Sequence, residues 1–169
     1  TLEQIAELVT AAALPADLPE RLYQETEGRP YFVVEYLYAL TAQGADQPWH
    51  IPGAVRELLL GRLAQVAETE RQLLQAAAAI GHAFRYELVQ TASGRSEEET
   101  VTALENLVAR GILVEQTAAA ASSVQAVYDF SHEKLRALAY EEMGLARRRL
   151  LHRRLAESLT DSVRRQSLG

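Results

Sequence analysis

Apolar residues recur at every third or fourth position along most of the chain, which is the spacing of one buried face on an α-helix. In the first part of the chain this pattern predicts helices over residues 2–13 and 17–26 and a third helix that begins near Pro30. Proline is favourable in the first turn of a helix, because its missing N–H needs no partner there. We expect the inward-facing side chains of the first and third helices to be Ile5, Leu8, Val9, Phe32, Val33, Tyr36, Leu37 and Leu40.

The helical spacing resumes further along, where it predicts helices over residues 52–64, 68–80, 86–92 and 96–110. The last of these begins with Ser96 followed three residues later by a glutamate, which is a capping-box pattern. The expected core positions of the three longer helices are Val55, Leu58, Leu59, Leu63, Leu73, Leu74, Ala77, Ile80, Val101, Leu104, Leu107 and Val108.

Two β-like stretches, 112–115 and 126–130, flank the small-residue segment 116–125. They predict a β-hairpin with a mobile tip. A helix that opens at His132 follows, and a last helix is predicted over 145–165. The order of helix, short helix, helix and hairpin is that of a winged helix. We therefore predict a mainly α fold, with a helical subdomain, a winged-helix domain containing one β-hairpin, and a C-terminal helix.

The best candidate for a domain boundary is the segment 42–53, AQGADQPWHIPG, which is rich in turn-forming residues. It divides the chain into a small helical subdomain over 1–48 and a winged-helix domain over 52–142. Residues 143–169 are predicted as a helix that leads to a downstream helical region.

His132 lies where an apolar stretch ends and a helix begins. The first turn of a helix has unpaired N–H groups and a partial positive charge, so it disfavours an imidazolium and favours an anion. A histidine in that place is expected to be neutral, beside a position where a phosphate could rest. The alternative interpretation is that Ser131 caps the helix and His132 is a half-buried polar residue.

The net charge of −6 is unevenly distributed. Residues 143–169 hold seven arginines against two acidic residues, which gives +5 and leaves −11 for the rest of the chain. The usual meaning of such a basic end is a solvated helix face, and contact with an acidic partner is the less common one. The chain begins with Thr1 and its single methionine is Met143, so we expect a segment of a longer protein.

Motifs for catalysis are missing from the sequence. The single lysine, Lys134, does not follow glycines at the spacing of a phosphate-binding P-loop. The four histidines are scattered and cysteine is absent, so a zinc site is not expected. No apolar run reaches the length of a membrane span, and we expect no membrane association. We therefore do not expect the chain to be an enzyme by itself.

The predicted recognition helix of the winged-helix domain is acidic. Glu97, Glu98, Glu99 and Glu105 stand on the helix that would enter a DNA groove, against Arg110 as its basic residue. Such a surface repels phosphate, whereas DNA-reading helices present basic or amide side chains. Direct DNA binding through this helix is not expected.

Three stretches together resemble the signal-transduction ATPases with numerous domains, the STAND type of AAA+ or NB-ARC-like regulator. TEGRPYFVVEYLYAL, at 26–40, is similar to their lid segment. IPGAVRELLLGRLAQVAETERQLLQAAAAIGHAF, at 51–84, resembles the start of their winged-helix domain, and YDFSHEKLRALAYEEMGLARRRLLHRRLAESL, at 128–159, resembles its end. The three follow in the family's order and cover nearly the whole chain. The similarity is greatest to large LuxR-family bacterial transcriptional regulators.

The resemblance implies roles for four residues. In this family a glycine-x-proline of the lid packs against the base and sugar of the nucleotide, and it matches Gly28, Arg29 and Pro30. A histidine after the wing contacts the β-phosphate of ADP in related switch ATPases, and it matches His132. The methionine and aspartate that flank that histidine in the family are serine and glutamate here. For Gly28 to Pro30, an ordinary turn and helix start remains the alternative.

The resemblance also implies a function and its partners. We expect a regulatory fragment of a cytoplasmic, ATP/ADP-controlled signalling switch, in which lid and winged helix close over a nucleotide. ATP or ADP would bind only in the full-length parent, whose P-loop core lies upstream and whose helical or output domain lies downstream. The alternatives are a non-catalytic adaptor domain that binds other proteins and a DNA-binding winged helix.

Overall fold

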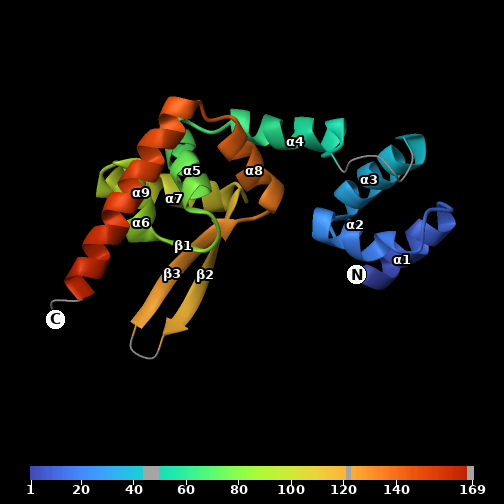
Figure 1. The fold of residues 1–169 in the computed structure, drawn as a ribbon, viewed down its shortest axis with the longest axis horizontal. Coiled ribbons are helices and arrows are strands. Elements are labelled where there is room, and N and C mark those ends of the chain that lie inside the picture. The colour runs from blue at the N-terminus through green and yellow to red at the C-terminus, as the bar shows by residue number, and fades with distance from the viewer. Residues whose placement is uncertain (44–49, 121–122, 167–169) are drawn as a thin grey trace. The chain divides into compact units, whose positions relative to one another are not determined.

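The chain folds mainly into helices, with a small antiparallel sheet (Figure 1). The computed structural model describes residues 1–43, 50–120 and 123–166. The elements are α1 (Leu2–Ala11), α2 (Leu18–Thr26), α3 (Pro30–Gln43), α4 (Gly53–Ala64), α5 (Glu68–Ile80), β1 (Phe84–Arg85), α6 (Tyr86–Ser93), α7 (Glu97–Ala109), β2 (Leu113–Ala120), β3 (Ser123–Phe130), α8 (Glu133–Glu141) and α9 (Leu145–Gln166). The prediction of a mainly α fold is confirmed.

The chain divides into two compact units, Thr1–Leu60 and Gly61–Gly169. The predicted boundary segment falls largely on residues 44–49, which lie outside the described residues. The predicted division into a lid, a winged helix and a C-terminal helix stays a prediction. Within the described ranges, no helix combines the length and the apolar character needed to cross a membrane.

The first unit is a three-helix cluster formed by α1, α2 and α3. Thr1 opens α1 with a capping box, in which its side chain accepts the N–H of Gln4. The prediction that Leu8 faces inward is wrong, because its side chain is 45% exposed. The buried stripe of α1 consists of two residues one turn apart, and Leu8 lies beside it. The buried core residues are Ile5, Val9, Leu18, Leu22, Val33, Tyr36 and Leu40.

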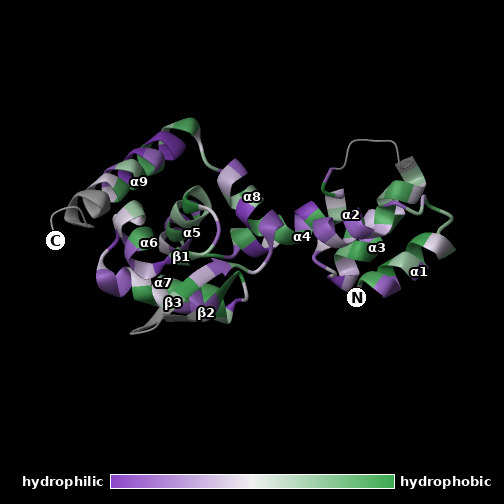
Figure 2. Ribbon diagram, turned by 60° about the horizontal axis from the view of Figure 1, so that its bottom comes forward, coloured by the Kyte–Doolittle hydropathy of each residue, from purple (hydrophilic) through white to green (hydrophobic). Residues whose placement is uncertain are grey.

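The second unit is built around α5, which packs against α6, α7, α8 and α9. Its buried face combines Leu73 and Leu74 with a run of alanines, Ala76 to Ala78, whose small side chains let neighbouring helices approach closely. Hydrophilic and hydrophobic residues alternate along α8 and along the coloured part of α9 (Figure 2), as one-sided burial of each helix requires. Leu58 and Val101, which were predicted to be buried, are 46% and 41% exposed.

The sheet has the strand order β1-β3-β2 in the described residues, with antiparallel pairing throughout. The hairpin of β2 and β3 pairs Leu113 with Phe130 at its base and Ala120 with Ser123 near its tip. The predicted strands were too short, because β2 continues to Ala120 and β3 begins at Ser123, while 121–122 lie outside the described residues. β2 and β3 stay paired through these small residues, because the backbone hydrogen bonds continue from the Leu113–Phe130 pair at the base of the hairpin. The mobility of the tip stays a prediction. The strand β1 was not predicted, since two residues carry no readable pattern.

Candidate functional site

The predicted lid residues form a tight turn between α2 and α3. Glu27 and Gly28 have φ values of 52° and 69°, so both take the left-handed conformation that ends α2. The Oγ1 of Thr26 accepts the N–H of Gly28 at 3.2 Å, and the N–H of Arg29 donates to the carbonyl of Thr26 at 3.0 Å. Pro30 is the first residue of α3, as predicted. The turn is thus fixed by local bonds.

A groove of about 550 Å³ opens beside this turn, between α1 and the start of α3. Gly28 and Pro30 line it, whereas Arg29 is exposed and is not part of its wall. The lining is mostly apolar, which explains the exposure of Leu8: its side chain forms one wall of the groove. A Cβ at Gly28 would lie 3.0 Å from Cε2 of Tyr23, so the backbone here needs both the small size and the positive φ of glycine.

His132 is the N-cap residue of α8. Its backbone is extended (φ −159°, ψ 136°), and its Nδ1 accepts the N–H of Lys134 at 3.1 Å. Because Nδ1 acts as an acceptor, the ring in this arrangement is neutral and has its proton on Nε2. The alternative in which Ser131 caps the helix is wrong. The side chain of His132 is 2% exposed, so it is fully rather than half buried.

An ionic cluster surrounds this corner of β3 and α8. Nε2 of His82 lies 3.2 Å from Oε2 of Glu133, and its Nδ1 lies 3.7 Å from Oδ1 of Asp129. Nε of Arg136 donates to Oε2 of Glu133 at 2.8 Å. Burial raises the pKa of Glu133, but the hydrogen bonds and charge of Arg136, aided by His82, outweigh it and hold this pKa below its ordinary value. His82 could not be paired with Glu133 from the sequence, because the two residues lie far apart along the chain.

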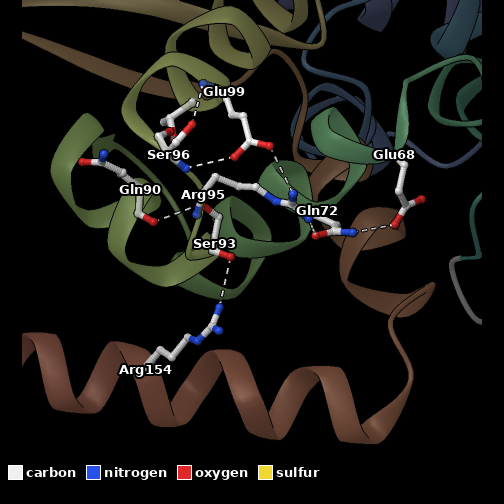
Figure 3. Close-up of polar contacts among 9 residues, drawn as sticks. Glu68, Gln72, Gln90, Ser93, Arg95, Ser96, Glu99 and Arg154 are labelled. Atoms are coloured by element: carbon white, nitrogen blue, oxygen red, sulfur yellow. Dashed lines mark hydrogen bonds and ion pairs between the residues drawn. The ribbon is translucent and has the colours of Figure 1, made fainter.

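A second polar cluster joins α5, α6, α7 and α9 (Figure 3). Arg154 of α9 donates from Nη1 to the carbonyls of Ala92 and Ser93, at 3.2 and 3.0 Å, and thereby completes the C-terminal end of α6. Arg95 donates to the amide oxygen of Gln72 on α5 and to Glu99 on α7. These bonds fix the turn between α6 and α7 against the two flanking helices.

The helix that a winged helix would use to read DNA is acidic on its exposed side. Glu97, Glu98, Glu99 and Glu105 of α7 are all exposed. Glu99 closes the predicted capping box, because its Oε2 accepts the N–H of Ser96 at 3.0 Å. That backbone hydrogen bond is the main reason why the pKa of Glu99 lies below its ordinary value. The Glu99 carboxylate therefore stays ionised at neutral pH.

The candidate ligand-binding residues fall in both units: Gly28, Arg29 and Pro30 in the first and His132 in the second. Among the residues that the structure describes, no group of three or more His, Asp or Glu side chains could hold a metal ion. In comparisons with known proteins, no family model, no curated protein and no solved structure matches this chain. The function must therefore be argued from the residues and the geometry.

Proposed function

We propose that the chain is the regulatory part of an ATP/ADP-controlled signalling switch, in which a lid and a winged helix close over a nucleotide held by a P-loop core of the parent protein. The lid would be residues 1–48 and the winged helix 52–142, followed by the helix at 143–169. The parent would be a STAND-type transcriptional regulator. Three features of the structure support this proposal.

The first is the arrangement of elements in the second unit. Helices α5, α6 and α7 precede the hairpin of β2 and β3, and the short strand β1 lies between α5 and α6. The strand β1 pairs with β3, so that the sheet order is β1-β3-β2. Three helices with a three-stranded sheet in this order are compatible with a winged helix. The acidic α7 supports a role in packing within the protein and not in DNA recognition.

The second is the groove beside Gly28 and Pro30. It is mostly apolar, and its volume of about 550 Å³ is within the range of small-molecule sites. A nucleotide base is a flat apolar surface with few polar edges, so it suits walls of aliphatic side chains. The turn at Gly28 brings backbone to the rim of the groove without a Cβ.

The observation that carries the proposal is the state of His132. Its Nδ1 caps α8, so the ring has its proton on Nε2, and in the proposed nucleotide-bound state this N–H would donate to a phosphate oxygen. The N-terminus of α8 adds a partial positive charge in the same place. Because the ring is 2% exposed, contact with a phosphate would require a rearrangement that uncovers it.

The proposal is tested on the full-length parent purified without added nucleotide. Protein denatured after purification is expected to release ADP in near-equimolar amount, because the closed state retains it. The matched comparison is the present chain alone, which lacks a P-loop and is expected to release none. A folded parent that contains no nucleotide and binds no ADP at millimolar concentration contradicts the proposal.

A specific observation favours an adaptor domain as the second candidate. Tyr31, Val34 and Tyr38 are 48%, 57% and 74% exposed and recur along one side of α3. Exposed aromatic residues in a helical row are typical of surfaces that bind other proteins. The adaptor interpretation predicts partner binding that is independent of nucleotide, whereas the switch requires that nucleotide changes it.

A further inference from the structure

Three arginines gather where α9 packs on α6 and α5. Arg147 and Arg154 are two helical turns apart on α9 and so share a face, and Arg95 lies in the turn between α6 and α7. Figure 3 shows Arg154 reaching from α9 to the end of α6, and Arg95 extending toward Gln72 of α5. The arrangement concentrates positive charge in an otherwise acidic chain.

Two of these arginines are held by protein acceptors. Arg154 uses Nη1 for the two carbonyls at the end of α6. Arg95 uses Nη2 for the neutral amide of Gln72 and Nη1 for Glu99, at 3.4 Å. The carboxylate of Glu99 is shared between Arg95 and the capping box of α7.

Arg147 is the arginine of these three that has buried N–H groups without an acceptor among the described residues. Its Nε and Nη2 are buried and have no hydrogen-bond acceptor in the described part of the chain. Burial lowers the pKa of Arg147, and the charges of Arg154 and Arg95 lower it further, while Glu68 acts in the opposite direction. Glu68 does not neutralise the group, since it is 70% exposed and lies 3.8 Å from Arg71.

An arginine remains protonated in proteins, so Arg147 cannot relieve this situation by losing its proton. A buried N–H without an acceptor is costly, and more so on a charged group. We propose that Arg147, with Arg95 and Arg154, forms a binding site for a small phosphate-class oxyanion. The anion would accept the unpartnered N–H groups of Arg147. It would also offset the repulsion among the three guanidinium groups.

The test measures binding of inorganic phosphate to the chain by titration calorimetry and thermal unfolding, against chloride at equal ionic strength. The wild-type chain is expected to gain about 3–6 °C in Tm at tenfold excess over Kd. Arg147→Gln is expected to bind phosphate roughly ten- to a hundredfold more weakly, because it loses hydrogen bonds to a charged group. Without phosphate its Tm is expected to equal or exceed that of the wild type, since the unpartnered charge is gone.

The matched control is Arg149→Gln, which removes the same charge from an exposed position on the same helix and is expected to bind phosphate like the wild type. If Arg147→Gln does not fold, Arg147→Lys is used in its place. The lysine variant keeps the positive charge but lacks the planar guanidinium, so it is expected to bind phosphate at least tenfold more weakly than the wild type. The proposal is overturned if phosphate has no effect beyond chloride, or if Arg147→Gln or its replacement responds like the wild type. It is also overturned if Arg149→Gln loses the response equally, which would show diffuse charge attraction.

A parallel titration with glycerol phosphate identifies the source of the anion. Equal binding of the ester and of inorganic phosphate supports a site for a phosphate group on a larger molecule. Binding of inorganic phosphate alone supports a site that closes around the free ion.

Discussion

Arg62 and Arg110 cap the ends of each other's helices. Nη2 of Arg62 donates to the carbonyls of Arg110 and Gly111, at 3.2 and 2.8 Å, where α7 ends. Nη1 of Arg110 donates to the carbonyl of Gln65 at 2.8 Å, where α4 ends. The last carbonyls of a helix have no partner inside it, so each arginine satisfies groups that the other's helix leaves open.

We expect Arg62→Ala and Arg110→Ala each to lower the free energy of unfolding by about 0.5–1.5 kcal/mol, the range of a single hydrogen bond. Because the two arginines act on one junction, the double variant is expected to lose less than the sum of the single losses, by about 0.5 kcal/mol or more. Urea unfolding of the four proteins measures this coupling. Arg71→Ala is the control with little expected effect, since Arg71 is 50% exposed and has one loose ion pair. Strict additivity contradicts the account of a shared junction.

Gly94 leaves space for Arg154, whose guanidinium donates to the last carbonyls of α6. Its φ is +72°, and a Cβ there would lie 2.7 Å from Nη1 of Arg154. Gly94→Ala is therefore expected to lower the free energy of unfolding by about 1–3 kcal/mol, through backbone strain and displacement of Arg154. In an Arg154→Ala background the same substitution is expected to cost less, because only the strain remains.

The matched control is Gly61→Ala in α4, where a Cβ has nothing within 4 Å and the backbone is helical. It is expected to stabilise the chain by about 0.5–1 kcal/mol. Thermal or urea unfolding compares the substitutions. An equal cost of Gly94→Ala with and without Arg154 would show that the guanidinium is not displaced.

The Glu133 cluster predicts a loss of stability in acid. The folded-state pKa of Glu133 is below its ordinary value of 4.5, so this group stabilises the fold fully above that pH. Its contribution is lost as the pH falls from about 4.5 through the lower folded-state pKa. The stability difference between wild type and Glu133→Gln is thus expected to shrink between pH 6 and pH 3. Glu105→Gln, at an exposed position on α7, serves as control. A pH-independent difference contradicts this prediction.

The acidic face of α7 predicts that the chain does not read duplex DNA. Glu97, Glu98 and Glu105 are exposed where a recognition helix would need positive charge. Weak binding at low salt through the arginines of α9 is compatible with this view. Gel-shift titrations at about 150 mM salt, where purely electrostatic binding fades, are expected to show no sequence-specific complex. A specific complex that survives this salt concentration would refute it.

Local sequence patterns predicted where the helices lie. They did not predict which residues at the edges of each apolar stripe are exposed. The spacing around Leu73 and Leu74 predicted α5 over the residues that form it, because a whole turn of apolar residues is buried there. Leu8, Leu58 and Val101 lie at the edges of their stripes, where exposure depends on what the rest of the fold covers. Sequence spacing alone contains no such information.

The polar contacts were even harder to predict from the sequence, because they join residues that only the tertiary structure brings together. Arg62 and Arg110 are 48 residues apart, and Arg154 meets Ser93 across 61 residues, so no local motif could pair them. By contrast, the turn at Gly28 and the helix start at His132 were predictable, because glycine and a capping side chain act on their immediate neighbours. The alternative that made Ser131 the cap placed the cap one position too early.

The most direct test of the switch compares two substitutions of His132 in the full-length parent. His132→Asn keeps a side chain that can cap α8 but removes the imidazole Nε2–H, whereas His132→Ala removes both. If His132 contacts the β-phosphate, both variants are expected to bind ADP about tenfold more weakly, and only His132→Ala is expected to lose thermal stability as well. If His132 only packs and caps, His132→Asn will bind ADP as the wild type does. ADP affinity of a stably folded His132→Asn parent is therefore the decisive measurement: a tenfold loss is predicted, and an unchanged affinity contradicts the nucleotide contact.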